Sequence, residues 1–134
     1  MASDNDPLAV RTALANARRN RAAWIEFIAA EGLGARPFRV RAPFDLVFAN
    51  ILLPPLKRLA GPMARIVWPR GGIIVLSGLL VAQENAALAA YRAHGLRLER
   101  RIRLDEWVTL VVRAPSYRTR RIKPGPVAAR AHGQ

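Results

Sequence analysis

Two carboxylates near the start of the chain stand in an arrangement that could bind a nucleoside. Asp4 and Asp6 lie in the run Ala-Ser-Asp-Asn-Asp-Pro at residues 2–7. Pro7 suits the first turn of a helix, whose amino end also favours acidic residues. A carboxylate between a strand and a helix can accept hydrogen bonds from both hydroxyls of a ribose. The same pattern also suits a helix cap, so the sequence leaves both interpretations open.

A second polar side chain closes a strongly apolar segment. Residues 44–52 read Phe-Asp-Leu-Val-Phe-Ala-Asn-Ile-Leu. The nearly continuous apolar stretch at 44–49 predicts a strand buried on both faces, as in a parallel sheet. Asn50 follows at the carboxyl end, where open α/β sheets bind their ligands. Because an amide both donates and accepts hydrogen bonds, Asn50 could hold an attacking amine beside a methyl donor. A turn asparagine is the alternative.

Periodicity along the chain predicts alternating helices and strands. The run Pro-Arg-Gly-Gly at 69–72 turns the chain into a second buried strand, which Gly78 ends, and we assign this run no catalytic role. The last two strands are predicted to form an antiparallel hairpin. The order is that of an α/β fold with helices on both faces of a sheet. The predicted elements are a helix at 8–20, a strand at 24–29, a loop at 32–43, a strand at 44–49, a helix at 54–67, a strand at 73–77, a helix at 83–94, and strands at 96–104 and 107–112.

The composition excludes several classes of protein. The chain has 134 residues, 51% of them hydrophobic, which suits one folded domain rather than a disordered chain. It has no cysteine, so disulfides and cysteine-based zinc sites are excluded, and we expect a cytoplasmic protein. His94 and His132 are far apart, and we expect no bound metal. The longest apolar run, 73–82, is too short to cross a bilayer, and the acidic start differs from a signal peptide.

Positive charge dominates the chain and gathers near its end. The net charge is +13, from 22 Lys and Arg against 9 Asp and Glu. No acidic residue follows Glu106, while basic residues continue to Arg130. Residues 115–134 are also rich in proline and glycine, so we expect a flexible basic tail after a domain at 1–114. The tail either only aids solubility or makes weak contact with RNA or an acidic protein surface.

The motifs, taken together and in order, resemble one protein family. The sequence contains Asp-x-Asp-Pro, Phe-Asp-Leu-Val-x-Ala-Asn-Ile-Leu, Pro-x-Gly-Gly-x-x-x-Leu-Ser-Gly and Glu-Trp-Val-x-Leu. This pattern resembles the carboxy-terminal part of the bacterial S-adenosylmethionine-dependent methyltransferases that modify large-subunit ribosomal protein eleven. The resemblance covers residues 2 to about 113. Asn-Ile-Leu and Leu-Ser-Gly are its more specific pieces, whereas many class I methyltransferases share Asp-x-Asp-Pro.

The resemblance implies a Rossmann-like fold and a role for each of three residues. Asp4 matches the acidic residue that binds the cofactor ribose, and Asn50 matches the asparagine at the cofactor and amine site. Glu31 falls where related enzymes place an acidic residue near the adenine amino group, with a surface glutamate as the alternative. The implied reaction methylates lysine and amino-terminal amines of a ribosomal protein. Such a transfer needs a deprotonated amine in line with the sulfonium, so positioning supplies much of the catalysis.

One expected feature of that family does not occur in front of Asp4. Family members carry a strand and a glycine-rich turn there, because glycine lets the backbone approach the cofactor. The only Gly-x-Gly pair here, Gly32 and Gly34, lies after the strand predicted at 24–29. The absent strand would lie at the centre of the sheet, between the strands that end at Asp4 and Asn50. Losing about five buried apolar side chains costs on the order of 10 kcal/mol, so we expect marginal stability and weak cofactor binding.

Three functions compete on this sequence. The first is a protein amine methyltransferase, inactive as this chain and active only with the upstream part restored. The second is a non-catalytic α/β remnant that binds RNA through its tail and the strand at 97–103. The third is methylation of a nucleic-acid base or a glutamine amide, which typically requires Asn-Pro-Pro-aromatic. Here Asn50 is followed by Ile-Leu-Leu, which argues against the third.

Overall fold

The computed structural model describes residues 1–115 of the chain, and the α/β fold with a partial sheet is confirmed. The predicted flexible tail falls at 115–134, and all of it after Pro115 lies outside the described residues. The elements are β1 (Ala2–Asp4), α1 (Pro7–Arg19), β2 (Phe27–Ala29), α2 (Arg36–Arg41), β3 (Leu46–Asn50), α3 (Leu53–Arg58), α4 (Ala60–Ile66), β4 (Ile73–Leu80), a 3₁₀ turn (Val81–Gln83), α5 (Glu84–Arg92), β5 (Arg97–Leu104) and β6 (Trp107–Arg113).

The strands form two separate sheets in the described part of the chain. β1 and β2 pair in parallel as a small sheet, against which α1 packs. The larger sheet has the order β3-β4-β6-β5. In it β3 and β4 are parallel, whereas β6 runs antiparallel to both β4 and β5. The predicted hairpin of the last two strands is therefore confirmed, and β1 and β3 are not paired with each other.

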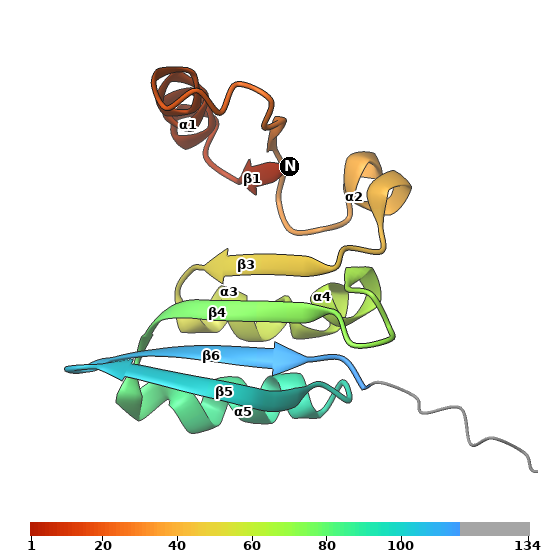
Figure 1. Cartoon of the computed structure of the whole chain (residues 1–134), viewed down its shortest axis with the longest axis vertical. Helices are drawn as coiled ribbons and strands as arrows, with labels where there is room; N and C mark the ends of the chain where they lie inside the picture. The colour runs from red at the N-terminus through yellow and green to blue at the C-terminus, as the bar shows by residue number, and fades with distance from the viewer. Residues whose placement is uncertain (116–134) are drawn as a thin grey trace, which may run out of the picture.

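The hydrophobic core lies between one face of the larger sheet and the helices α3, α4 and α5, which Figure 1 shows behind the strands. Alternate residues of β4 and β6 are buried there, as the period of two in a strand requires. Ile74, Leu76 and Leu110 are completely buried. Burial of such side chains stabilises the fold by roughly 1.5–3 kcal/mol each, so this core positions everything that the sheet carries.

Tyr91 of α5 links the helices inside this core. Its side chain is completely buried, and its hydroxyl donates a hydrogen bond to the backbone carbonyl of Leu56 at 3.1 Å. The hydroxyl also lies 3.1 Å from the sulfur of Met63. Burial raises the pKa of the Tyr91 phenol, so the group stays a neutral donor.

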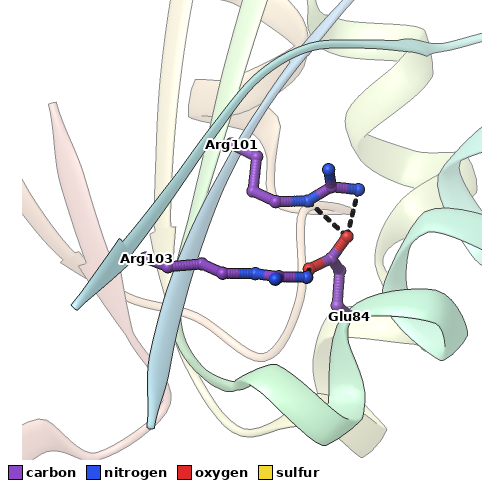
Figure 2. A network of polar contacts seen from close by, with 3 residues as sticks. All are labelled: Glu84, Arg101 and Arg103. Carbon is purple, nitrogen blue, oxygen red and sulfur yellow. Dashed lines mark hydrogen bonds and ion pairs between the residues drawn. The ribbon is translucent and has the colours of Figure 1, made fainter. Parts of the chain in front are cut away.

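A buried carboxylate holds the edge strand β5 against α5. Glu84, in the first turn of α5, accepts hydrogen bonds from Arg101 Nε at 2.5 Å and from Arg103 Nη2 at 2.9 Å (Figure 2). Glu84 is buried, while both arginines are partly exposed. Burial raises the pKa of the Glu84 carboxyl, but Arg103 and Arg101 lower it by more, so the net pKa lies below the ordinary value of 4.5.

The second face of the larger sheet carries no helix among residues 1–115. Phe48 points to this face and is 74% exposed, and Trp107 is 48% exposed. The prediction that the first apolar strand is buried on both faces is therefore wrong for the chain as described. Its apolar sequence is that of a strand with two covered faces. The described residues cover only one of them.

Two segments differ from their prediction, because a proline in the first turn of a helix is tolerated whereas one in the interior is not. The predicted loop at 32–43 contains the helix α2, with Pro37 in its first turn and the side chain of Phe38 buried beneath it. The predicted helix at 54–67 is two helices, α3 and α4, which meet at Leu59. Pro62 lacks the N–H that a continuous helix would require, and it is tolerated in the first turn of α4.

Gly78 does not end its strand as predicted. β4 continues to Leu80 through a β-bulge, because the register with β6 shifts between Leu76 and Leu79. Gly78 has φ +71° in this bulge, a conformation that favours glycine. The bulge keeps Leu76 and Leu79 buried on the same face while it exposes Gly78 on the other.

Candidate functional site

A cleft of about 730 Å³ lies between β1 and β3 and is bounded by α3, α4 and the loop after β2. It brings together the three residues that were predicted, from the sequence motifs and the family resemblance, to bind the cofactor. Asp4 ends β1, Asn50 ends β3, and Glu31 follows β2, and all three line the cleft. Figure 1 shows the arrows of β1 and β3 pointing the same way, so Asp4 and Asn50 stand at the same end of the cleft.

The two carboxylates at the start of the chain have separate tasks. Asp6 is the N-cap of α1, because its side chain accepts a hydrogen bond from the backbone N–H of Leu8 at 2.8 Å. Asp4 Oδ1 accepts one from the N–H of Asp6 at 2.9 Å, which orients the carboxylate. Asp6, and not Asp4, is therefore the helix cap that the sequence pattern allowed. Asp4 faces the cleft with one oxygen that has no hydrogen-bond partner among residues 1–115, and that oxygen could accept a ligand hydroxyl.

Asn50 packs against the glycine in the bulge of the neighbouring strand. It is paired in register with Ser77, directly before Gly78. A Cβ atom at Gly78 would overlap Asn50 Oδ1, so any other residue at this position requires the Asn50 side chain to move. Asn50 is thus not a turn residue, because it ends a paired strand and the neighbouring strand limits the position of its side chain. An amide held at the carboxyl end of a parallel strand is well placed to orient a ligand by hydrogen bonds.

Glu31 lies beyond the end of β2, with its side chain exposed at the edge of the cleft. The next residue, Gly32, has φ +67°, which suits the turn that leads the chain away from the cleft. Glu31 lines the same cleft as Asp4 and Asn50, and its contact with an adenine group stays a prediction.

Three residues in or beside this site were not predicted from the sequence. Arg58 of α3 is the only Lys or Arg among the described residues that line the cleft, and its position on an expected helix gave no signal. Phe48 was assigned to the core, but its side chain borders the cleft and the open face. Gly78 was taken as a strand terminator, although the Leu-Ser-Gly motif was noted as specific and could have indicated a site role.

Other kinds of site find no support in residues 1–115. No group of three His, Asp or Glu side chains there could hold a metal ion. In the same part of the chain, no helix combines the length and the apolar character needed to cross a membrane. The cleft therefore presents carboxylate and amide groups at the ends of parallel strands, an arrangement suited to a polar organic ligand such as a nucleoside.

Two solved structures of methyltransferases share this fold. The ribosomal protein L11 methylase from Lactobacillus delbrueckii subsp. bulgaricus aligns with a TM-score of 0.73 at 23% identity, over 82% of this chain and 54% of that one. The precorrin-6y C5,15-methyltransferase from Geobacter metallireducens GS-15 aligns with a TM-score of 0.64 at 15% identity, over 84% of this chain and 66% of that one.

The sequence comparisons show the family to which the chain belongs. The family model described as Ribosomal protein L11 methyltransferase (PrmA) matches residues 1–115, and the chain belongs to this family. The ribosomal protein L11 methyltransferase of Bradyrhizobium diazoefficiens is 47% identical over 114 residues, which are 84% of this chain and 38% of that protein. The protein of the same name from Caulobacter sp. strain K31 is 44% identical over 113 residues, 84% of this chain. The chain thus spans 38% of the length of these relatives.

Proposed function

We propose that this chain forms the part of an S-adenosylmethionine-dependent methyltransferase that binds the nucleoside of the cofactor and orients the amine to be methylated. The observation that carries the proposal is the placement of Asp4 and Asn50. They come from two separate sheets and line one cleft at the same ends of their strands. The family supports S-adenosylmethionine as the cofactor and ribosomal protein L11 as the substrate.

The side chains of the cleft fit the groups of this cofactor. S-adenosylmethionine supplies a methyl group bonded to a positively charged sulfur. Asp4 has a fixed carboxylate with a free oxygen, suited to accept hydrogen bonds from ribose hydroxyls. Glu31 offers a second acceptor, suited to an adenine amino group. The two carboxylates also place negative charge near a cationic cofactor, which favours its binding.

Asn50 is the residue proposed to hold the methyl acceptor. Its amide oxygen can accept an N–H from an uncharged amine, which fixes the direction of the nitrogen lone pair. A charged lysine has no lone pair to donate, so the amine must lose a proton before transfer. Holding the two reacting groups in line supplies much of the rate increase, and a misplacement of about 1 Å can cost roughly 100-fold. The contact with Gly78 limits where the amide can lie.

The described part of the chain leaves the cleft open on one side. No strand lies between β1 and β3, and no Gly-x-Gly turn stands in front of Asp4. We therefore propose that the isolated chain binds the cofactor weakly and does not methylate at a useful rate. A micromolar dissociation constant for the isolated chain, measured by calorimetry, would refute this part of the proposal.

A chimera tests whether this segment supports methyl transfer. Residues 1–115 replace the matched segment of the Bradyrhizobium diazoefficiens relative, and methyl transfer from labelled S-adenosylmethionine to ribosomal protein L11 is measured. We expect activity, and a loss of about 100-fold or more for Asn50→Ala. Asn85→Ala is the matched control, because Asn85 is exposed on α5 and is not part of the cleft. An inactive chimera, or near-normal turnover by Asn50→Ala, would contradict the assigned role.

Contact with RNA stays a prediction, and the structure narrows where it could occur. Arg101 and Arg103 of the proposed RNA-binding strand are engaged by Glu84. Arg97 and Arg100 on the same strand are exposed. The basic tail lies outside the described residues, and a cytoplasmic location also stays a prediction from the cysteine-free composition.

A further inference from the structure

The end of α1 and the loop that follows it carry an exposed tryptophan close to exposed arginines. Trp24 lies between α1 and β2 and is 82% exposed, the highest fraction among the large apolar side chains of residues 1–115. Arg18 and Arg19 in the last turn of α1, and Arg21 directly after it, are exposed as well. A single exposed apolar side chain is common on protein surfaces, so its neighbours decide what it can bind.

The positive charge in this part of the chain is not balanced by acidic groups. Residues 7–25 contain four arginines and no aspartate or glutamate. The next carboxylate along the chain, Glu26, forms an ion pair with Arg41. None of the ion pairs within residues 1–115 involves an arginine of 7–25. Because such arginines attract anions, this surface suits a polyanion.

The backbone at Arg21 makes the position of its side chain costly. Asn20 ends α1, and the chain turns there with a hydrogen bond from the N–H of Ala22 to the carbonyl of Ala17 at 2.7 Å. Arg21 has φ +56°, in the left-handed region where glycine is the usual residue after a helix. The attraction of cations to the carboxyl end of a helix explains arginines in the last turn, but glycine would suit this turn better than Arg21. A side chain kept in such a conformation indicates a use for it.

We propose that Trp24 and the arginines at the end of α1 form a binding surface for single-stranded RNA. An exposed indole offers a face on which a base can stack, and nearby arginines can contact the phosphates. Stacking accounts for the tryptophan, which an acidic protein surface would not require. A lipid surface fits less well, because the apolar stripe of α1, at Val10, Leu14 and Ala17, is buried or half-buried.

This surface is separate from the cleft and from the RNA contact predicted at 97–103. None of Arg18, Arg21 and Trp24 lines the cleft. Figure 1 shows α1 and β5 in opposite halves of the molecule. The choice of RNA over DNA rests on the proposed function, because its substrate is a ribosomal protein and ribosomal proteins bind RNA. The surface itself does not depend on that function, so the two can be tested separately.

Fluorescence anisotropy of a labelled single-stranded RNA of about ten nucleotides, titrated with the full chain and without cofactor, measures this binding. We expect Trp24→Ala to weaken it about tenfold or more, as the loss of one stacked base does. Trp24→Phe keeps an aromatic ring and should stay within about threefold of wild type. Leu8→Ala is the matched control, because Leu8 is 60% exposed at the other end of the same helix. Equal losses in Trp24→Ala and Leu8→Ala would overturn the stacking role.

The salt dependence tests the arginines. Arg18→Gln combined with Arg21→Gln removes two charges, so the slope of log affinity against log salt should become less steep by about 1.4. Arg70→Gln combined with Arg92→Gln is the control, since both arginines are exposed and α5, which carries Arg92, lies far from α1 (Figure 1). Equal changes of slope in the two double variants would show only a general attraction to a basic chain and would contradict the proposal.

Arg21→Gly separates a binding role from a structural one. Glycine suits φ +56°, so the urea midpoint should rise, while the affinity for RNA should fall by about fivefold in about 0.1 M salt. Arg21→Lys keeps the charge and should keep the affinity. A lower urea midpoint with unchanged affinity in Arg21→Gly would mean that Arg21 serves the fold instead.

Three competitors identify the partner: a DNA oligonucleotide of the same sequence, polyglutamate, and vesicles of phosphatidylserine and phosphatidylcholine. We expect the RNA to bind at least as tightly as the DNA and more tightly than the other two. Tighter binding of any competitor would overturn RNA as the partner. Because no cofactor is present, a chain that binds RNA but not S-adenosylmethionine would refute the proposed function alone.

Discussion

The side-chain oxygen of Asn50 occupies the space that a Cβ atom on Gly78 would fill. The two residues belong to neighbouring strands, β3 and β4, and the bulge in β4 brings the backbone of Gly78 against the amide. Asn50 is therefore placed by a backbone feature of the next strand. This relationship explains why a glycine follows the buried part of β4 and connects the fold directly to the proposed site.

Replacing Gly78 with alanine should displace Asn50. The positive φ of Gly78 costs an L-residue roughly 1–2 kcal/mol, and the new methyl group also collides with the amide. Gly95→Ala is the matched control, because Gly95 has φ +80° and no atom within 4 Å of an added Cβ. We expect similar losses of unfolding free energy in urea, but altered NMR signals of the Asn50 amide only in Gly78→Ala. Unchanged Asn50 signals would show that Gly78 does not position it.

Removing the buried carboxylate of Glu84 should destabilise the fold. Glu84→Gln removes the negative charge and one of the two oxygens that accept from Arg101 and Arg103, and hydrogen bonds to charged groups contribute about 1.5–3 kcal/mol. The arginines are partly exposed and can reach water, so we expect a loss of about 1–2 kcal/mol in the free energy of unfolding. Glu99→Gln is the control, because the Glu99–Arg113 pair is exposed and screened by water, so its removal should cost much less stability. Equal losses would contradict the buried role of Glu84.

The same carboxylate predicts the direction of the pH dependence. The pKa of Glu84 is lowered in the folded chain, so its stabilising effect is present above pH 4.5 and is lost as the pH falls through the lowered value. Glu84→Gln cannot lose a proton, so its stability should depend less on pH in this range. The measurement is the urea midpoint between pH 3 and pH 6 for both proteins. If the urea midpoints of the two proteins change equally with pH, protonation of Glu84 does not cause the loss of stability.

Tyr91 should resist ionisation in the folded chain. Burial raises its pKa, and its hydroxyl donates to Leu56. The unfolded chain ionises near the ordinary pKa of 10.0, so the contribution of Tyr91 to stability is full below that pH and declines above it. Tyr91→Phe should lose about 0.5–1.5 kcal/mol at neutral pH and should remove this alkaline decline. A phenolate absorbance change at pH 10.5 that is equal in folded wild type and Tyr91→Phe would confirm a shielded Tyr91. A larger change in wild type would contradict it.

The sequence predicted most of the fold because its main signals are local. The alternation of buried residues along β4 and β6 and the apolar side of α3 and α4 follow from periodicity alone. The helix α2 was missed because a short helix with Pro37 in its first turn looks like a loop, and only the burial of Phe38 stabilises it. The exposure of Phe48 could not be predicted either, since the sequence of a strand does not reveal whether both faces are covered.

Part of the candidate site could be predicted from the sequence, because the positions of Asp4 and Asn50 follow from the order of the strands. Asp4 and Asn50 follow strands, and polar residues at the carboxyl ends of parallel strands converge. The division of tasks between Asp4 and Asp6 needed geometry, because both suit a helix start in sequence. Gly78 needed geometry too, since its contact with Asn50 depends on the register of two strands that are far apart in the sequence.

The most direct test of the account is an NMR titration of the chain with S-adenosylmethionine, which detects weak binding. We expect the backbone amide signals of Asp4, Glu31 and Asn50 to shift together, while those of β5 stay fixed. Asp4→Asn should reduce the affinity at least about tenfold, because the asparagine amide replaces one acceptor oxygen and removes the charge. Asp6→Asn keeps the cap of α1 and should leave the affinity unchanged. Shifts outside the cleft, or equal affinities for the two variants, would contradict the assignment of this cleft as the cofactor site.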